Sequence, residues 1–369
     1  MPLVVVGLKE RAYPVHVQRG LLPQLGSLIK KQGLLNGRAL VVSQKQVAVY
    51  TERAVSESLA NEGFEFSFFI TPQAKSSEAA KSEVVFSKLV KRIASYDGKH
   101  KSIFLIALGG GVIGDLTGFA ASVYRRGIPY IQIPTTLTAQ VDSAVGGKTG
   151  IDLPEGKNLL GSIYQPALVL SDSQLLDSLP ERHWSDGFAE VIKYGVTHDP
   201  ALFALLENKG KEGIKKTPRL LDKVIHRCAR IKAKIVEKDE WDKKGLRMVL
   251  NFGHTAGHAI EAASKFSRQY THGEAVAIGM LVACDIAEKL GVLKERALTG
   301  RLEKTLMKFE LPLFYRGLGI DTLLKAIGYD KKSDKGLNRF VLPVSFGKTA
   351  LVRDVPLSAI TDSLERRKG

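Results

Sequence analysis

The first half of the chain alternates short apolar segments with amphipathic helical patterns, and this alternation constrains the fold most strongly. Three apolar segments have the length of strands: residues 38–43, 64–70 and 102–108. Between them, residues 82–94 carry apolar residues spaced for one face of a helix, namely Val84, Val85, Leu89, Val90 and Ile93. Strands that alternate with helices are joined by crossovers, which predicts a parallel sheet with helices packed on it.

The pattern changes after about residue 173, where long amphipathic helices are predicted. Residues 220–236 and 275–290 carry apolar residues at helical spacing, and residues 339–344 are typical of a short strand or hairpin. A chain of 369 residues is long for a single core. We therefore predict two domains, an α/β domain at 1–175 and a mostly α-helical domain at 176–369.

Composition excludes several classes of protein. Cys228 and Cys284 are too few for a disulfide framework, and buried thiols in a reducing compartment are the simpler interpretation. No segment approaches the roughly 20 apolar residues that a membrane span requires. Residues 1–7 are predicted to form a first strand because no basic region precedes their apolar run. A cytoplasmic protein without membrane contact is expected.

The formal net charge is +16, from 54 basic and 38 acidic residues. Such a charge fits nucleic-acid binding, attraction of a small anionic substrate, or simply a basic surface. Aromatic residues are not interleaved with the basic ones in a pattern that would stack bases. We therefore expect a solvated basic surface and no nucleic-acid partner.

A glycine-rich turn follows the third predicted strand, with the sequence Gly-Gly-Gly-Val-Ile-Gly-Asp at 109–115. Glycines at this place allow a tight strand-to-helix turn and a close approach of backbone N–H groups to a pyrophosphate. The spacing differs from the usual dinucleotide fingerprint, so a turn without a ligand is the alternative interpretation.

A second polar loop runs from Asp142 to Thr149 and ends in Gly-Gly-Lys-Thr. It is not a phosphate loop of a nucleotide triphosphatase, because Asp142 stands where the first glycine of that motif belongs. Together with Lys157 and Asn158, Asp142 and Lys148 suit a ligand rich in anionic oxygens. An ordinary charged surface turn remains the alternative.

Three of the chain's eight histidines fall within residues 254–272. His254 and His258 are four residues apart and share a face of a predicted helix. With His272 and the upstream Glu190, His254 would complete a zinc site of one carboxylate and two imidazoles with an open position. The alternatives are a hydrogen-bonded core histidine and, for Glu190 with Lys193, a structural ion pair.

Taken together and in this order, these motifs resemble the sugar-phosphate cyclase family, and within it the 3-dehydroquinate synthases. The resemblance runs nearly end to end and is strongest over 109–172, 190–195, 245–274 and 330–343. It implies an N-terminal Rossmann-like domain, a mostly α-helical C-terminal domain, and an active site in the cleft between them. It also implies a homodimer that uses NAD and a Zn²⁺ or Co²⁺ ion.

Residue roles follow from this resemblance by position. Glu190, His254 and His272 match the metal ligands, whereas His258 matches a residue that faces the substrate and its phosphate. The remaining matches to substrate-binding positions are Lys148, Asn158, Lys193, Asn251 and one of Lys331 or Lys332. Lys232 and Arg247 match residues around a substrate carboxylate, and Asp142 matches a residue that contacts hydroxyls. Arg126 matches an arginine that enters the partner subunit's active site.

The NAD contacts that the resemblance implies lie mostly in the first domain: Glu78, Lys81, Gly110, Gly111, Val112, Ile113, Gly114, Asp115, Thr135, Thr136, Lys148, Lys157 and Ser178.

Two positions depart from the family pattern. Gln44 stands where an aspartate usually binds the adenosine ribose, and Ser77 replaces a glycine just before Glu78. A neutral amide makes a weaker hydrogen bond to a hydroxyl than a carboxylate does.

The reaction implied is conversion of 3-deoxy-D-arabino-heptulosonate 7-phosphate to 3-dehydroquinate and phosphate, in the shikimate pathway, with NAD regenerated in each turnover. Sister cyclases act on substrates without a carboxylate, so Lys232 and Arg247 favour the shikimate enzyme. A polyol dehydrogenase would not need phosphate-binding lysines at 148 and 193. The non-enzyme alternative is a basic binding protein that has lost catalysis.

Overall fold

The protein is described here from a computed structural model that covers residues 3–33, 37–73, 78–97, 102–264, 269–328 and 338–369. Ser77, Lys331 and Lys332 lie outside these ranges. The chain forms two compact units, unit 1 (Met1–Leu179 with Ile225–Trp241) and unit 2 (Pro180–Val224 with Asp242–Gly369). No helix in the described ranges has the length and apolar character needed to cross a membrane.

Unit 1 contains a seven-stranded sheet in the order β1-β2-β9-β6-β5-β3-β4. Neighbouring strands are parallel except β1 and β2, which confirms the predicted parallel sheet. The strands are β1 (Leu3–Val6), β2 (Tyr13–Val17), β3 (Gly37–Ser43), β4 (Glu65–Ile70), β5 (Ser102–Gly109), β6 (Tyr130–Pro134) and β9 (Leu168–Ser171).

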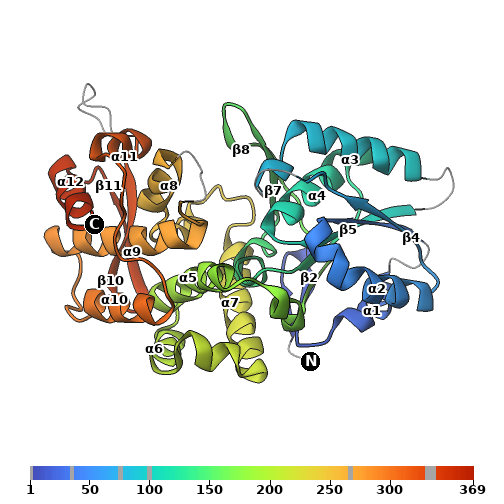
Figure 1. Cartoon of the computed structure of the whole chain (residues 1–369), viewed down its shortest axis with the longest axis horizontal. Coiled ribbons are helices and arrows are strands. Elements are labelled where there is room, and N and C mark those ends of the chain that lie inside the picture. The colour runs from blue at the N-terminus through green and yellow to red at the C-terminus, as the bar shows by residue number, and fades with distance from the viewer. Residues whose placement is uncertain (1–2, 34–36, 74–77, 98–101, 265–268, 329–337) are drawn as a thin grey trace. The chain divides into compact units, whose positions relative to one another are not determined.

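Helices cover both faces of this sheet (Figure 1). Successive residues of β3 face opposite sides: Val41 packs with α1 (Leu25–Lys31) and α2 (Lys45–Asn61), and Leu40 packs with α3 (Glu83–Tyr96) and α4 (Gly111–Val123). Both faces are therefore apolar, which explains why the strands appear in the sequence as continuous apolar runs.

The strand order reverses between β3 and β5. From β3 the chain passes to β4 on one side of it and then to β5 on the other. The Ser43 hydroxyl donates a hydrogen bond to the Leu108 carbonyl at 2.8 Å, so the carboxyl ends of the two strands are tied together. In sheets of this kind the reversal point is where ligands bind, and both Gln44 and the glycine turn follow directly from these strand ends.

Unit 2 is mostly helical. The described helices assigned to it are α5 (Glu181–Thr197), α6 (Pro200–Lys215), α8 (His254–Ala263), α9 (His272–Lys289), α10 (Leu298–Lys308), α11 (Ile320–Ala326) and α12 (Leu357–Arg366). The predicted late strand is confirmed as one arm of a hairpin, β10 (Arg339–Ser345) with β11 (Lys348–Arg353). Cys228 and Cys284 are both buried thiols that form no disulfide, as predicted.

Helix α7 (Pro218–Lys238) is shared between the units, and its residues from Ile225 onward belong to unit 1. There Glu237 accepts a hydrogen bond from the Gly7 backbone at 2.7 Å, and Lys232 pairs with Asp142 at 2.9 Å. The predicted division at 175/176 did not include this return of the chain, because helical spacing does not reveal which sheet a helix packs against.

Glycines let three helices of unit 2 approach closely. A Cβ at Gly279 of α9 would overlap the carbonyl oxygen of Gly253 and lie 2.8 Å from the Gly257 nitrogen of α8. A Cβ at Gly273 would likewise overlap the Asp186 carbonyl oxygen of α5. These contacts are between backbones, which cannot move aside as a flexible side chain would.

We predict that Gly279→Ala lowers the free energy of unfolding by about 1–3 kcal/mol, because the added methyl group overpacks the α8–α9 contact. Gly300→Ala is the matched control: it also lies within a helix, α10, but an added Cβ there meets nothing within 4 Å. The control should be neutral or stabilising by up to about 1 kcal/mol. Equal denaturation midpoints for the two variants would contradict the packing argument.

Candidate metal and cofactor sites

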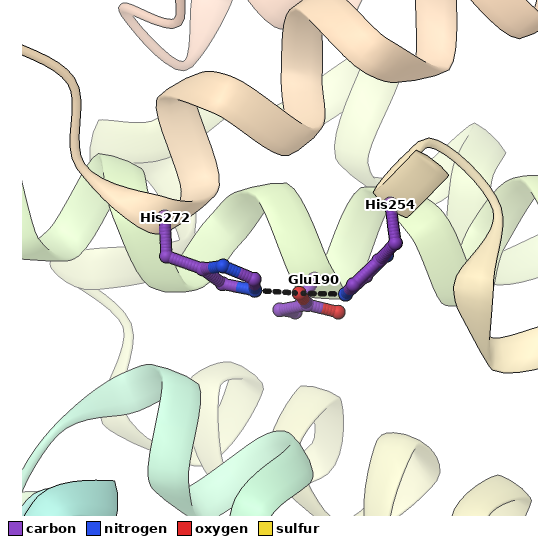
Figure 2. A group of neighbouring side chains, drawn as sticks. All are labelled: Glu190, His254 and His272. Carbon is purple, nitrogen blue, oxygen red and sulfur yellow. Dashed lines mark hydrogen bonds and ion pairs between the residues drawn. The ribbon is translucent and has the colours of Figure 1, made fainter. Parts of the chain in front are cut away.

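Two histidines and a glutamate from three helices of unit 2 meet around one carboxylate oxygen (Figure 2). The Glu190 Oε1 atom of α5 lies 3.2 Å from Nε2 of His272 and 3.5 Å from Nε2 of His254. One ligand atom from each residue lies within 4.8 Å of the other two. We call these residues the Glu190 triad. Two imidazoles and a carboxylate form a donor set that Zn²⁺ accepts while keeping a position open.

Local structure fixes where the two histidines begin their helices. His254 is the first residue of α8 and follows Gly253, whose φ of 82° suits glycine. His272 is the first residue of α9, which starts with a reciprocal capping box between Thr271 and Glu274. Arg182 of α5 binds the Glu274 carboxylate through two hydrogen bonds of 2.7 and 2.8 Å.

The buried charge of Glu190 has a specific counterion. Lys193, one turn later on α5, pairs with Oε2, and the two side chains are only 1–2% exposed. Burial alone disfavours the ionised carboxyl, but Lys193 and then His254 hold the pKa of Glu190 well below its usual range. Glu190 and Lys193 were predicted to form either a structural ion pair or part of a functional site. Both descriptions apply, because their buried ion pair lies inside the candidate site.

The two imidazoles differ in their affinity for protons. Burial, and then the charge of Lys193, lowers the pKa of His254. Burial also opposes the charged form of His272, but its hydrogen bonds to Glu190 and Glu261 raise its pKa well above the usual value. Around neutral pH, Glu190 is therefore ionised and His254 is a neutral imidazole with one unprotonated ring nitrogen. His272 instead carries a proton on both ring nitrogens.

Each histidine of the triad has a partner on its other ring nitrogen. Nδ1 of His254 lies 3.2 Å from the Phe252 carbonyl oxygen, and Nδ1 of His272 lies 3.2 Å from Glu261 Oε2. Such partners leave Nε2 directed at a metal.

Sequence reasoning assigned no role to Glu261; the available signal was its position three residues after His258 on the same helical face.

His258 does not belong to the triad, although its ring centroid lies 5.3 Å from that of His254. Its side chain is exposed, whereas His254 is buried. The pair of histidines four residues apart is thus confirmed on α8, but the members occupy different environments. His258, Glu261 and His272 form a second group of donors beside the first.

In unit 1 the glycine turn joins β5 to α4. Gly110 precedes the helix with φ of −72°, so positive φ is not the reason for this glycine. Space is the reason: a Cβ at Gly110 would lie 3.0 Å from Thr136 Cγ2, and one at Gly111 would lie 2.9 Å from Ser143 Oγ. Thr135 donates a backbone hydrogen bond to the Gly109 carbonyl at 3.0 Å, which holds the two predicted cofactor loops together.

The buried Lys81 side chain is surrounded by several residues of unit 1 that were predicted to contact the cofactor or substrate. Lys81 Nζ lies 2.9 Å from Asp115, 3.7 Å from Glu78 and 3.8 Å from Asp152. It also donates a hydrogen bond to Asn158, and Lys157 lies 3.6 Å from Glu78. Burial raises the pKa of Asp115 to about 6 despite the opposing charge of Lys81. Asp152 is the member of this Lys81 cluster that sequence reasoning did not identify.

Lys232 and Asp142 also meet. Lys232 Nζ lies 2.7 Å from the Asp142 backbone oxygen and 2.9 Å from its carboxylate. Asp142 lies in a π-helical turn, Ala139–Ser143, a rare form that is frequent at functional sites. Lys232 was predicted to lie near a substrate carboxylate and Asp142 to contact substrate hydroxyls; a direct contact between the two was not predicted.

The other predicted residues have varied surroundings. Thr135 and Arg247 are buried, Thr136 is half-buried, and Lys148, Ser178 and Asn251 are exposed. Arg126 is exposed and has an unusual φ of 63°, next to Arg125 at 49°. The Arg125 guanidinium lies 2.8 Å from buried Asp97, which holds this left-handed turn. No described contact joins Arg126 or Ser178 to the groups above.

Comparison with known proteins gives consistent matches over the chain. Residues 71–186 match the family model 3-dehydroquinate synthase N-terminal, and residues 187–333 match 3-dehydroquinate synthase C-terminal. A 3-dehydroquinate synthase of Acidithiobacillus ferrooxidans is 41% identical over 365 residues, covering 99% of this chain and 98% of the relative. One from Pelobacter propionicus is 40% identical over 353 residues, covering 95% and 96%.

Solved structures resemble the chain over nearly its whole length. The 2-epi-5-epi-valiolone synthase of Streptomyces hygroscopicus, solved with NAD⁺ and Zn²⁺ bound, is 30% identical with a TM-score of 0.83 and covers 96% of each chain. A 2-deoxy-scyllo-inosose synthase is 23% identical with a TM-score of 0.86, covering 99% of this chain and 100% of that one, a likeness of fold.

Metal binding at the triad is predicted to release about one proton near pH 7, because the ion must displace the proton of His272 while Glu190 and His254 are already deprotonated. The raised pKa of His272 means that metal affinity falls as the pH drops through that value. Calorimetric titration of Zn²⁺ in two buffers of different ionisation enthalpy measures the proton count. Zinc binding without proton release at pH 7 would contradict the assignment.

Proposed function

We propose that this chain, which belongs to the 3-dehydroquinate synthase family, converts 3-deoxy-D-arabino-heptulosonate 7-phosphate to 3-dehydroquinate and phosphate. It is then a carbon–oxygen lyase of the shikimate pathway that leads to chorismate and the aromatic amino acids. The observation that carries the proposal is the Glu190 triad, which offers metal ligands in a chain about 40% identical to named synthases.

The triad fits a divalent ion on chemical grounds. All three donor atoms converge, the carboxylate is ionised, and both imidazoles are oriented through Nδ1. Glu190, His254 and His272 would hold Zn²⁺ or Co²⁺. When bound, the metal supplies a Lewis acid and NAD supplies a hydride acceptor that is regenerated within the same turnover.

The chain's own groups hold and orient the substrate. Lys193 is held beside the triad by its ion pair with Glu190, so a phosphate bound there would meet an ammonium group that is already oriented. His258 is exposed and lies beside the triad, which supports its proposed role in binding phosphate oxygens. The remaining proposed substrate contacts are Lys148, Asn158, Asn251, Asp142, Lys232 and Arg247.

NAD is proposed to bind unit 1 where the strand order reverses. The Gly110–Asp115 turn offers backbone N–H groups at the start of α4, and Thr135 and Thr136 adjoin it. The Lys81 cluster lies one helical turn further along α4, at Asp115. Glu78, Lys148, Lys157 and Ser178 complete the proposed contacts.

A sister cyclase activity is the second candidate, because a 2-epi-5-epi-valiolone synthase shares the fold and 30% identity. Identity to the named 3-dehydroquinate synthases is higher, at 40–41%. Lys232 and Arg247, which match residues around a substrate carboxylate, are both buried, and Lys232 already pairs with Asp142. The observations therefore favour the shikimate enzyme.

The proposed quaternary state is a cytoplasmic homodimer in which Arg126 enters the partner subunit's active site. Arg126 is exposed, and its strained backbone is held by the Arg125–Asp97 ion pair on the neighbouring residue. Strain that the surrounding structure enforces is typical of a residue presented for function.

Phosphate release from the heptulosonate phosphate tests the proposed reaction. Release is expected only with NAD and a divalent metal, and chelation should abolish it until Zn²⁺ or Co²⁺ is restored. His272→Ala and Glu190→Gln should lose both activity and bound metal, whereas His183→Ala, an exposed histidine on α5, should keep both. Release that persists without NAD would indicate a phosphatase and overturn the proposal.

Complementation tests the shared active site. Arg126→Ala and His272→Ala should each be inactive, but a randomly mixed sample should recover roughly a quarter of wild-type activity, since half the dimers are mixed and each has one intact site. The control mixes Arg126→Ala with itself. A lack of recovery in verified mixed dimers would place Arg126 outside the partner's site.

A further inference from the structure

Glu261 is a partly buried carboxylate that contacts the triad without belonging to it. It lies near the end of α8, its side chain is 12% exposed, and its Oε2 atom lies 3.2 Å from Nδ1 of His272. The proposed reaction assigns it no role. Its contact is with the nitrogen on the far side of the imidazole from Glu190, which faces Nε2.

That contact determines which nitrogen of His272 can bind a metal. A neutral imidazole has one N–H donor and one lone pair, and the hydrogen bond made by one nitrogen decides the state of the other. An ionised carboxylate only accepts hydrogen bonds, so Glu261 keeps the proton on Nδ1. When a metal ion displaces the Nε2 proton that faces Glu190, the lone pair is exposed on Nε2 and directed into the triad.

His254 also has an acceptor at Nδ1 that leaves Nε2 for the metal, but this acceptor is a backbone group. Its Nδ1 faces the Phe252 carbonyl, a backbone group fixed by the turn before α8, and its side chain is only 11% exposed. His272 is 34% exposed and has no such carbonyl among its described contacts. It therefore depends on a side chain for its orientation, and a charged acceptor makes the stronger bond.

We propose that Glu261 is a positioning residue that fixes the tautomer and ring orientation of His272 and thereby sets the metal affinity of the site without contacting the ion. This inference rests on the metal site of the proposed function. It distinguishes Glu261 from a fourth ligand, because an atom on the Nδ1 side of the ring cannot reach an ion bound at Nε2.

The test measures affinity for Zn²⁺ and Co²⁺ by competition with a chromophoric chelator, in the full-length protein stripped of metal. Glu261→Ala is expected to weaken binding by about 10–100-fold. Glu261→Gln, which keeps an acceptor oxygen but loses the charge, should show a smaller loss. At saturating metal, kcat of Glu261→Gln should return close to the wild-type value. Glu212→Ala, an exposed glutamate on α6, is the control and should bind metal normally.

Thermal unfolding of the metal-free variants separates positioning from simple helix contact. Equal midpoints for wild type and Glu261→Gln, with weaker metal binding, support the inference. Wild-type metal affinity in Glu261→Ala overturns it, as does a second metal ion per chain that disappears in that variant. His272→Ala, measured in parallel, separates this failure from that of the site: if it too binds metal normally, the triad itself is wrongly assigned.

Discussion

The ionised carboxylate of Glu190 is the feature on which the arrangement of unit 2 depends. Burying an unpaired charge costs far more free energy than a domain can spare, so its surroundings must compensate it from every side. Lys193 neutralises one oxygen, and the two imidazoles face the other. A bound cation would strengthen this compensation, which suggests that the site is built for occupancy by a metal.

The compensation depends on helix packing that only glycine permits. Gly279 and Gly257 bring α9 against α8, and Gly273 brings the start of α9 against α5. The same contacts place His272 and His254 on either side of Glu190. Ridges of larger side chains would hold helices 8–10 Å apart and separate the donors. Stability and metal geometry are therefore two consequences of one packing arrangement.

Sequence reasoning identified those features that depend on residue type and local spacing. The strands at 38–43 and 102–108, the paired histidines of α8 and the glycine turn are all local patterns, and the structure contains each of them. Contacts that depend on which surfaces meet were not predictable from periodicity. The return of residues 225–241 to unit 1, the Lys232–Asp142 pair and the Glu261–His272 bond are of that kind.

The Lys81 cluster constrains how a dinucleotide could bind unit 1. Around Lys81 and Lys157 stand three carboxylates, those of Glu78, Asp115 and Asp152. Such a group does not carry the excess of positive charge that a pyrophosphate needs. The backbone N–H groups at the start of α4 do offer a complementary field. The start of α4 therefore suits the phosphates of a dinucleotide. The Lys81 cluster suits its hydroxyl and amide groups, because the cluster offers both hydrogen-bond donors and acceptors.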